Sequence, residues 1–312
     1  MTPAAWREAF IAQVMAAPSA SLAAFREGLA AEGASALQPV LCPMVIDLAF
    51  HGRIEAAVRE WHLGMHTVLA SWADDQLEPI AVPAELRSRV VSEARERRAL
   101  GSTRYDFIVK DDGELALIEC QAGDPSGMGV EEASAGAFAR LGVEGVQRSS
   151  VASSMRRFVA EHPSRAGLVV FVIHHDAFLE WDVARLVKVF RAEGVEAVMA
   201  DPSELSFRDG RLWLGGRTVD TVVRDSLEDL LAPERVEASR AFLAAWVNDA
   251  VRVVNPAGSI VADHKVLLGR LKTRGVPETR ALGDELPERP RWVLKPSDGF
   301  GGFDVTIGPA VS

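Results

Sequence analysis

The sequence of 312 residues has few cysteines, no long hydrophobic run and no excess of positive charge. Its two cysteines, Cys42 and Cys120, lie far apart without a CxxC partner, which argues against a disulfide framework and a zinc–thiolate cluster. With 34 Lys and Arg against 44 Asp and Glu, the net charge is −10. This acidic balance argues against non-specific nucleic-acid binding, which depends on a positive field, but it excludes no ligand that needs one local basic pocket.

Membrane and export signals are also missing. No stretch approaches the ~18 uncharged apolar residues of a membrane-spanning helix. The N-terminus, MTPAAWREAFIAQVM, carries Glu8 in an amphipathic pattern and lacks the basic region and apolar core of a signal peptide. We therefore expect a soluble cytoplasmic protein without nucleic-acid or membrane partners. The length suggests about two domains and is sufficient to bury a large core.

The hydrophobic pattern changes along the chain. The first hundred residues predict helices, because Trp6, Phe10 and Val14 repeat at helical spacing and 54–72 continues the pattern. From residue 105, the segment YDFIVKDDGELALIEC predicts two strands joined by a turn at 111–113. Asp-Gly between two apolar runs is a strong signal for such a hairpin.

A βαβ pattern follows between residues 166 and 230. The continuous apolar run at 168–173 predicts a strand buried on both faces, and 183–190 predict an amphipathic helix that Gly194 ends. The other expected elements are a strand at 195–199, a hairpin at 208–219, a strand at 221–223, one long helix at 234–254, a short helix at 265–271 and a strand at 292–294.

Three polar side chains on the predicted hairpin could bind a metal. Asp106 can lie across from Glu119, and Glu119 and Gln121 share a face because they are two residues apart. Two carboxylates and an amide oxygen suit Mg²⁺, which takes one or two carboxylates together with substrate phosphates. A solvent-exposed face with ordinary charges stays the alternative interpretation.

A second cluster lies near residue 300. Lys295 ends a predicted strand and precedes Gly299, Gly301 and Gly302. Glycines let backbone N–H groups close over phosphate oxygens, and the lysine adds a positive charge. The spacing is not that of a Walker A motif, so a glycine-rich turn without a ligand stays open. Lys265, at the start of a short helix, is a weak signal alone.

Four sequence blocks together resemble a known family. They are RYDF at 104–107, IECQAGDP at 118–125, NPAGSIVADHK at 255–265 and VLKPSDGFGGFDV at 293–305. In order and approximate spacing they resemble the circularly permuted ATP-grasp ligases, such as glutathionylspermidine synthetase and, more distantly, eukaryotic glutathione synthetase. The resemblance implies an α/β (α+β) fold with a circularly permuted ATP-grasp-like core, a helical N-terminal region and an inserted open α/β lobe.

The resemblance implies four parts in the chain. They are a helical N-terminal region at 1–100, the metal-site hairpin and helices of the core at 101–165, an open α/β substrate lobe at 166–254, and the nucleotide-binding lysines and glycine-rich loop at 255–312.

Roles for individual residues are implied in the same way. Asp106, Glu119 and Gln121 resemble the family's Mg²⁺ ligands, and Arg104 resembles the arginine that faces the γ-phosphate and the reacting acyl phosphate. The residues that resemble the family's contacts to ATP are Lys265, Lys295, Gly299, Gly301 and Gly302. The implied activity is an ATP- and Mg²⁺-dependent carboxylate–amine ligase, in which positioning and charge stabilisation supply most of the catalysis. Its substrates would be a small-molecule or peptide carboxylate and an amine.

Two features depart from the family pattern. The family's asparagine is Gln121 here, one methylene longer. Family members also continue beyond the position of Ser312 with segments that close the adenine pocket, so we expect either further sequence or a relative that has lost part of the site. A nucleotide-binding or scaffold protein without ligase chemistry is therefore the alternative. An unrelated α/β binding protein is a third possibility.

Weaker signals lie where the predicted parallel strands end. His174, His175 and Asp176 follow one strand, and Arg224 and Asp225 follow another. Because ligands of open α/β sheets bind outside the carboxyl ends of the strands, these five residues are candidate substrate contacts. Polar loops that only end the strands are an equally good interpretation.

Two further patterns have simple explanations. His62 and His66 stand four apart on a predicted helix but lack a third ligand, so we interpret them as ordinary helix histidines. Strand alternation points Cys120 into the core, where a free cysteine behaves as a small hydrophobe. The sequence leaves the oligomeric state open, including a homodimer formed through the N-terminal helices.

Overall fold

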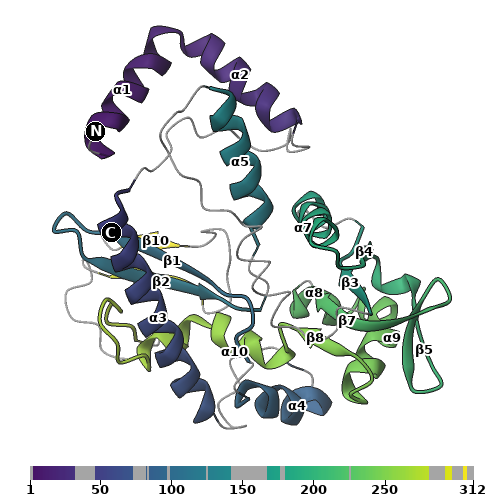
Figure 1. Cartoon of the computed structure of the whole chain (residues 1–312). Coiled ribbons are helices and arrows are strands. Elements are labelled where there is room, and N and C mark those ends of the chain that lie inside the picture. The colour runs from purple at the N-terminus through teal and green to yellow at the C-terminus, as the bar shows by residue number, and fades with distance from the viewer. Residues whose placement is uncertain are drawn as a thin grey trace. The chain divides into compact units, whose positions relative to one another are not determined.

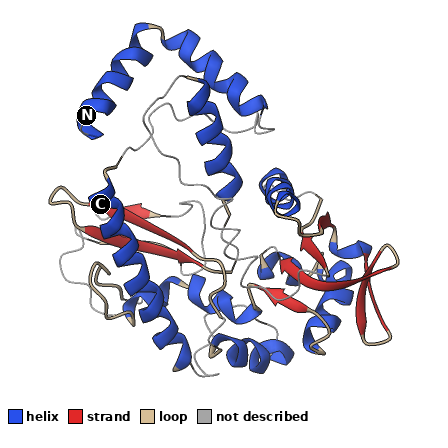
Figure 2. Cartoon of the chain, in the orientation of Figure 1, coloured by secondary structure: helices blue, strands red, loops and turns tan. Residues whose placement is uncertain are grey.

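A computed structural model of the chain describes residues 3–31, 46–72, 82, 84–96, 99–123, 126–141, 167–175, 180–224, 226–280, 292–296 and 305–307. It is a mixed α/β structure with parallel and antiparallel strands, consistent with the α+β class (Figure 1, Figure 2). The chain divides into two compact units. The sheet unit comprises Met1–Arg53, Ser126–Arg224 and Glu234–Arg252, and the hairpin unit comprises Ile54–Pro125, Asp225–Pro233 and Val253–Ser312. The predicted four-part division stays a prediction.

The sheet unit is built on a mixed sheet with the strand order β4-β3-β7-β6-β5, and β8 (Arg252–Val254) pairs with β7 where this unit ends. β3 is parallel to both β4 and β7, whereas the pairs β5–β6 and β6–β7 are antiparallel. The elements are α1 (Pro3–Ala16), α2 (Pro18–Ala31), α5 (Met128–Arg140), β3 (Leu168–Val172), α7 (Glu180–Ala192), β4 (Ala197–Ala200), the 3₁₀ turn η2 (Pro202–Glu204), β5 (Leu205–Arg208), β6 (Arg211–Leu214), β7 (Arg217–Arg224) and α9 (Val236–Val247).

β3 is the central strand, and every residue in it is buried, which confirms the prediction from its continuous apolar run. Val169 and Phe171 pack against the apolar side of α7, where the Phe171 and Phe190 rings meet edge to face at 5.1 Å between centroids. The predicted stop after α7 is also confirmed. Gly194 has φ of +80°, a conformation that glycine adopts without steric cost.

The N-terminal helices form a smaller core in the same unit. α2 places Phe25 and Leu29 against Ala133 and Ala137 of α5. The Phe25 ring also lies 4.7 Å from the ring of Phe138, centroid to centroid. Small alanine side chains on α5 let the two helices approach closely, and the large α2 side chains fill the space between them.

The hairpin unit is organised around the antiparallel pair β1–β2 (Figure 1). Most of α3 (Leu48–Ala70) belongs to it. Its other elements are α4 (Ala84–Ala94), β1 (Arg104–Val109), β2 (Leu115–Gln121), α8 (Leu227–Leu231), η3 (Ala257–Ser259), α10 (Ile260–Asp263), η4 (Lys265–Gly269), β9 (Val293–Leu294) and β10 (Thr306–Ile307). The hairpin predicted at 105–120 is confirmed.

One face of this hairpin rests on α3. Trp61, Met65 and Leu69 repeat every four residues and are completely buried. The Trp61 ring lies about 6 Å from the rings of Tyr105 and Phe107 on β1. Its indole N–H donates to the carbonyl of Arg274 at 2.8 Å, which satisfies the polar atom of this buried ring.

The helix predicted over 234–254 is wrong at its C-terminal end. α9 ends at Val247, Asp249 takes a positive φ of 53°, and 252–254 form β8. The segment Asn248-Asp249 favours a turn, and the β-branched residues after it fit a strand better than a helix. The short strand expected at 221–223 is the second half of the longer β7.

Among the described residues, no single helix is long and apolar enough to cross a membrane. The bent pair Ala5–Ala16 and Pro18–Ala31 passes that test jointly, on length and composition alone.

Candidate functional site

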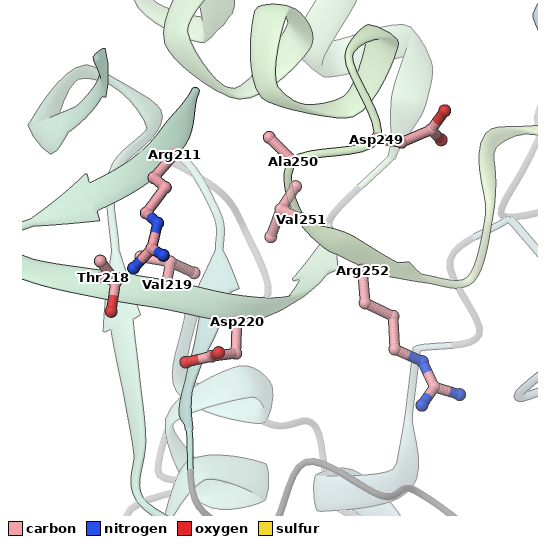
Figure 3. A pocket seen from close by; sticks show the side chains of 8 residues that line it. All are labelled: Arg211, Thr218, Val219, Asp220, Asp249, Ala250, Val251 and Arg252. Carbon is pink, nitrogen blue, oxygen red and sulfur yellow. The ribbon is translucent and has the colours of Figure 1, made fainter. Parts of the chain in front are cut away.

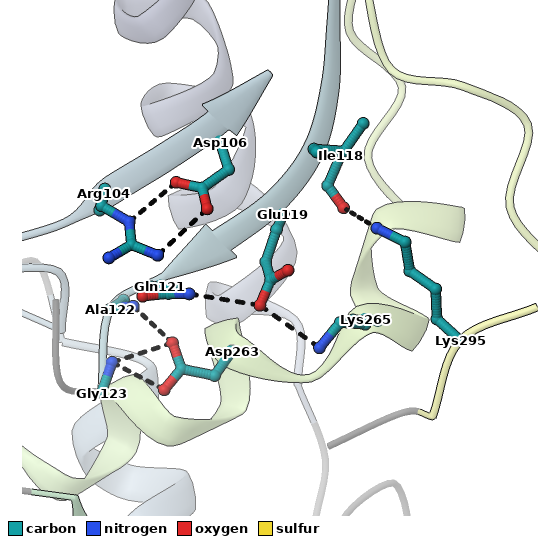
Figure 4. Close-up of polar contacts among 10 residues, drawn as sticks. All are labelled: Arg104, Asp106, Ile118, Glu119, Gln121, Ala122, Gly123, Asp263, Lys265 and Lys295. Carbon is teal, nitrogen blue, oxygen red and sulfur yellow. Dashed lines mark hydrogen bonds and ion pairs between the residues drawn. The ribbon is translucent and has the colours of Figure 1, made fainter. Parts of the chain in front are cut away.

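Four polar side chains lie on the face of the β1–β2 hairpin opposite α3. The register places Asp106 across from Glu119 and Arg104 across from Gln121. This agrees with the predicted pairing of the two carboxylates. Figure 4 shows the four side chains together with two lysines from distant parts of the chain. We call this set, with Lys265 and Lys295, the hairpin cluster.

Two cations offset the repulsion within this cluster. Like charges directly opposite each other destabilise a strand pair, so Asp106 and Glu119 need partners. Arg104 donates to both carboxylate oxygens of Asp106, from Nε at 2.8 Å and from Nη2 at 3.1 Å. Lys265 Nζ lies 3.4 Å from Glu119 Oε1, and the Gln121 amide N–H₂ donates to the same oxygen at 3.4 Å. Each carboxylate is therefore paired with a side-chain cation.

The third cation, Lys295, contacts the hairpin in a different way. A β-bulge interrupts the register, because the partners of Asp106 and Phe107 are Glu119 and Leu117, which leaves Ile118 without an opposite residue. Lys295 Nζ donates to the Ile118 carbonyl at 3.4 Å (Figure 4). The bulge thus offers an acceptor beside Glu119, and Lys295 binds that carbonyl rather than the carboxylate of Glu119 or Asp106 in the part of the chain that the structure describes.

Asn255 fastens both ends of the hairpin. Its side-chain oxygen accepts from the Ser102 N–H at 2.6 Å. Its amide N–H₂ donates to the carbonyls of Ser102 and Ala122, at 2.8 and 2.6 Å. The residue is only 4% exposed, so these bonds are protected from water. One side chain therefore joins the residues just before β1 and just after β2.

Asp263, the last residue of α10, holds the loop that follows β2. Its carboxylate accepts from the backbone N–H groups of Ala122 and Gly123 (Figure 4). A Cβ on Gly123 would collide with the Asp263 carboxylate, so this close approach requires glycine. Lys265 follows two residues later, and this attachment therefore brings it onto the hairpin.

Buried and partly buried groups support the hairpin from the α3 side. The Tyr105 hydroxyl lies 3.0 Å from His62 Nδ1. The His62 and His66 rings meet edge to face, with 4.8 Å between their centroids. Burial lowers the pKa of His62, and neighbouring His66 lowers it further. Burial raises the pKa values of Tyr105 and Cys120 well above their usual ranges, so both stay protonated. Cys120 is 3% exposed, as the strand alternation predicts.

The structure thus brings six of the predicted site residues together in the hairpin cluster. Gly299, Gly301 and Gly302 lie outside the described residues, as do Asp176 and Asp225 of the predicted substrate contacts. Sequence reasoning missed Asn255 and Asp263 as organising residues. Both lie inside the NPAGSIVADHK block, from which only Lys265 was singled out, so a closer examination of the polar residues in that block could have found them.

The remaining predicted substrate contacts belong to the sheet unit. β3 and β7 are parallel, so His174 and Arg224 lie at the same edge of the sheet, and both are buried. His174 Nδ1 is 3.6 Å from Asp201 Oδ2, and its Nε2 has no hydrogen-bond partner within the part of the chain that the structure describes. His175 is exposed, with Nε2 3.5 Å from a Glu204 carboxylate oxygen.

Asp201 also organises this edge. Burial acts to raise its pKa, but hydrogen bonds from the Ser203 hydroxyl and from the backbone N–H groups of Ser203 and His175 outweigh that effect, so the pKa lies below its ordinary value of 3.8. Its side chain caps η2. The carboxylate therefore has a structural task that is independent of any ligand.

A pocket of about 420 Å³ lies elsewhere in the sheet unit (Figure 3). Arginine and aspartate side chains alternate around it, and none of its residues is a predicted site residue. The lining consists of Arg211, Thr218, Val219, Asp220, Asp249, Ala250, Val251 and Arg252. Asp220 also accepts a hydrogen bond from the Leu168 N–H at 3.2 Å, which ties the beginning of β3 to β7.

Comparison with known proteins concerns the fold. The chain is similar to a glutathione synthetase-like effector from Globodera pallida, solved in its apo form. The TM-score is 0.53 at 12% sequence identity, and the similarity covers 82% of this chain and 65% of that one. No protein-family model and no curated protein matches the sequence. At this identity the similarity shows a related fold and nothing about chemistry.

Proposed function

We propose that the chain is an ATP- and Mg²⁺-dependent carboxylate–amine ligase that acts through an acyl phosphate, on a circularly permuted ATP-grasp-like core. The observation that carries the proposal is the hairpin cluster, in which two carboxylates, an amide and three cations from separate segments meet on one strand pair. The fold similarity to a glutathione synthetase-like effector is consistent with the ligase-like fold that the proposal requires.

The donor set of this face fits Mg²⁺. Asp106 and Glu119 supply two carboxylates and Gln121 an amide oxygen, all hard ligands of the kind this ion prefers. Within the described residues, no group of three His, Cys, Asp or Glu side chains could hold a metal by itself. Mg²⁺ held by these groups would complete its coordination with water and with phosphate oxygens of the nucleotide, as this ion usually does. The ion would neutralise charge on the phosphates.

The three cations fit the polyphosphate. Lys265 and Lys295 would bind phosphate oxygens of ATP, and Arg104 would face the γ-phosphate, where its fork matches a transferring phosphoryl group. In the proposed reaction a substrate carboxylate oxygen attacks the γ-phosphorus and ADP leaves. The amine then attacks the acyl carbon and releases inorganic phosphate. Catalysis rests on positioning and on neutralising the phosphoryl oxygens.

The acid and the amine belong to the proposal only as classes, a small-molecule or peptide carboxylate and an amine. His174, His175 and Arg224 stay candidate contacts for them. Their place at the carboxyl edge of parallel strands is where open α/β sheets bind ligands.

Trapping of the acyl phosphate tests the proposal directly. The full chain is incubated with ATP, Mg²⁺, hydroxylamine and a panel of amino acids and short peptides, because hydroxylamine converts acyl phosphates into stable hydroxamates. We expect hydroxamate and ADP in equal amounts with at least one acid. Lys295→Ala and Asp106→Ala should each reduce turnover by roughly 10²-fold or more, since each removes a group aimed at the phosphates or the metal.

Glu114→Ala is the matched control, because Glu114 lies on the same hairpin but pairs with Arg274 on the exposed turn side. It should leave turnover unchanged. Melting with a non-hydrolysable ATP analogue separates the alternatives. At about 100 times its dissociation constant a ligand adds about 2.7 kcal/mol of stability, which raises Tm by several degrees. A Mg²⁺-dependent shift without hydroxamate would favour a nucleotide-binding protein that has lost ligase chemistry, and no shift would eliminate both.

A further inference from the structure

Both carboxylates that could ligate the metal are engaged by cations in this structure. Glu119 contacts Lys265, and the two side chains are only 18% and 12% exposed. Asp106 is held by both donors of the Arg104 fork, with the side chains 35% and 39% exposed. The groups proposed for Mg²⁺ are thus bound to the groups proposed for phosphate (Figure 4).

Lys295 differs from these two cations. Its Nζ contacts a backbone carbonyl, that of Ile118, and no contact in the described structure links it to Asp106 or Glu119. Lys295 therefore does not compete with a metal for a ligand. Lys265 and Arg104 thus contact carboxylates, whereas Lys295 contacts a backbone carbonyl. Lys295 therefore serves as an internal control.

A divalent cation that binds alone must displace Lys265 from Glu119. The displaced ammonium then stays beside the incoming charge in a site with little water, where repulsion is weakly screened. A polyphosphate changes this balance, because it offers Lys265 and Arg104 new anionic partners. Their departure exposes the oxygens of Glu119 and Asp106 to the metal.

We infer that Lys265 and Arg104 hold the metal-binding carboxylates until nucleotide phosphate draws them away, so that metal and nucleotide bind with strong positive coupling. The inference rests on the proposed function, since it assigns the regulation of that same site. By linkage, the factor by which nucleotide raises the affinity for metal equals the factor by which metal raises the affinity for nucleotide.

The test measures metal binding without turnover. Mn²⁺ serves as the probe, and its free concentration is followed by electron paramagnetic resonance with the full chain and no nucleotide. Lys265→Gln should bind Mn²⁺ about tenfold more tightly than the wild type, although the same change removes a phosphate contact and weakens nucleotide binding. Lys265→Arg, which keeps a positive charge beside Glu119, should bind Mn²⁺ as the wild type does.

Lys295→Gln is the matched control. It should weaken binding of the ATP analogue and leave the affinity for Mn²⁺ alone unchanged. Arg104→Gln tests the second pair independently, because it removes the cation beside Asp106. Like Lys265→Gln, it should raise the affinity for Mn²⁺. Because Arg104 is partly exposed, this variant keeps the inference testable if Lys265→Gln does not fold, as judged by circular dichroism.

The outcomes separate the two proposals. Unchanged or weaker Mn²⁺ binding in the Lys265→Gln and Arg104→Gln variants overturns the inference, even if the ATP analogue binds the wild type normally. Failure of the wild type to bind the ATP analogue, with or without Mg²⁺, overturns the proposed function. The comparison of Mn²⁺ affinities still decides in that case whether the cations compete with a metal for the carboxylates.

Discussion

Asp182 of the sheet unit and the two acids of the hairpin cluster are held by different kinds of partner. In the sheet unit, Asp182 is 2% exposed and accepts from the backbone N–H groups of Gly127 and Val130, each at 3.0 Å. In the hairpin cluster, Asp106 and Glu119 are paired with side-chain cations. Backbone N–H groups cannot leave without local unfolding, whereas arginine and lysine side chains can rotate to another anion. A carboxylate held by backbone N–H groups is therefore interpreted as structural, and one paired with a side-chain cation in the hairpin cluster as a candidate functional group.

Asp263 shows that this distinction does not simply follow the division into units. It belongs to the hairpin unit, yet its partners are the backbone N–H groups of Ala122 and Gly123. It is structural in the same sense as Asp182, and it lies beside the exchangeable pairs. A rigid attachment next to groups that can move is what a preformed binding site needs, because the fixed part keeps the geometry while the cations change partners.

The largest expected effect is on stability and comes from Asp182→Ala. The change leaves two part-buried backbone N–H groups without their charged acceptor, so we expect the sheet unit to lose about 3 kcal/mol of unfolding free energy. Hydrogen exchange followed by mass spectrometry checks this unit by unit. Faster exchange in α5 and α7 with unchanged exchange in β1 and β2 is the expected pattern. Equal protection throughout would mean that this aspartate is as dispensable as a surface acid.

Gly123→Ala should have the next largest effect. The new Cβ would collide with the Asp263 carboxylate and displace it from the N–H groups of Ala122 and Gly123, at a cost of about 2 kcal/mol. Gly52→Ala on α3 is the control, because nothing lies within 4 Å of a Cβ there and alanine favours a helix by up to about 1 kcal/mol. Chemical denaturation of both variants measures the difference, and a destabilised Gly52→Ala with a stable Gly123→Ala would contradict the packing described here.

Acid should affect the two units over different pH ranges. The folded-state pKa of His62 is lowered, so the unfolded chain binds the proton more readily. The stability that His62 contributes is complete above its unfolded pKa of about 6.5 and declines as pH falls below that value. The Asp201 pKa is also lowered, but for an acid the contribution is complete above about 3.8 and declines below it.

Unfolding free energies measured between pH 7.5 and 5 therefore test the contribution of His62. His62→Gln keeps a polar partner near the Tyr105 hydroxyl and removes the titration, so its stability should vary less with pH than that of the wild type. An identical pH dependence in the two proteins would exclude His62 as the cause of the decline.

Asp106→Asn should have the smallest effect on stability. The Arg104–Asp106 pair is more than a third exposed, and its loss also removes a like charge opposite Glu119. We expect a change of less than about 1 kcal/mol in unfolding free energy. A loss as large as that of Asp182→Ala, measured in the same denaturant series, would make Asp106 a structural acid and remove the contrast drawn above.

The sequence predicted those elements whose signals are local. The Asp-Gly turn between two apolar runs identified the β1–β2 hairpin, and the continuous apolar run identified β3 as a buried strand. The error at 234–254 also has a local cause. Its apolar residues continue beyond the turn at Asn248 and Asp249. The sequence pattern therefore predicts a helix that extends past the point where α9 ends.

The sequence by itself determined which side chains share a face of the hairpin, because strand alternation follows from covalent geometry. Only the tertiary structure decided what those side chains contact. Asn255, Asp263 and Lys265 reach the hairpin from more than 130 residues away in the chain, and no local pattern encodes such contacts. The bulge at Ile118 belongs to the same class, since an extra residue is visible only against the partner strand. Local periodicity thus determined which side chains share a face, and long-range packing determined which partner each charged group contacts.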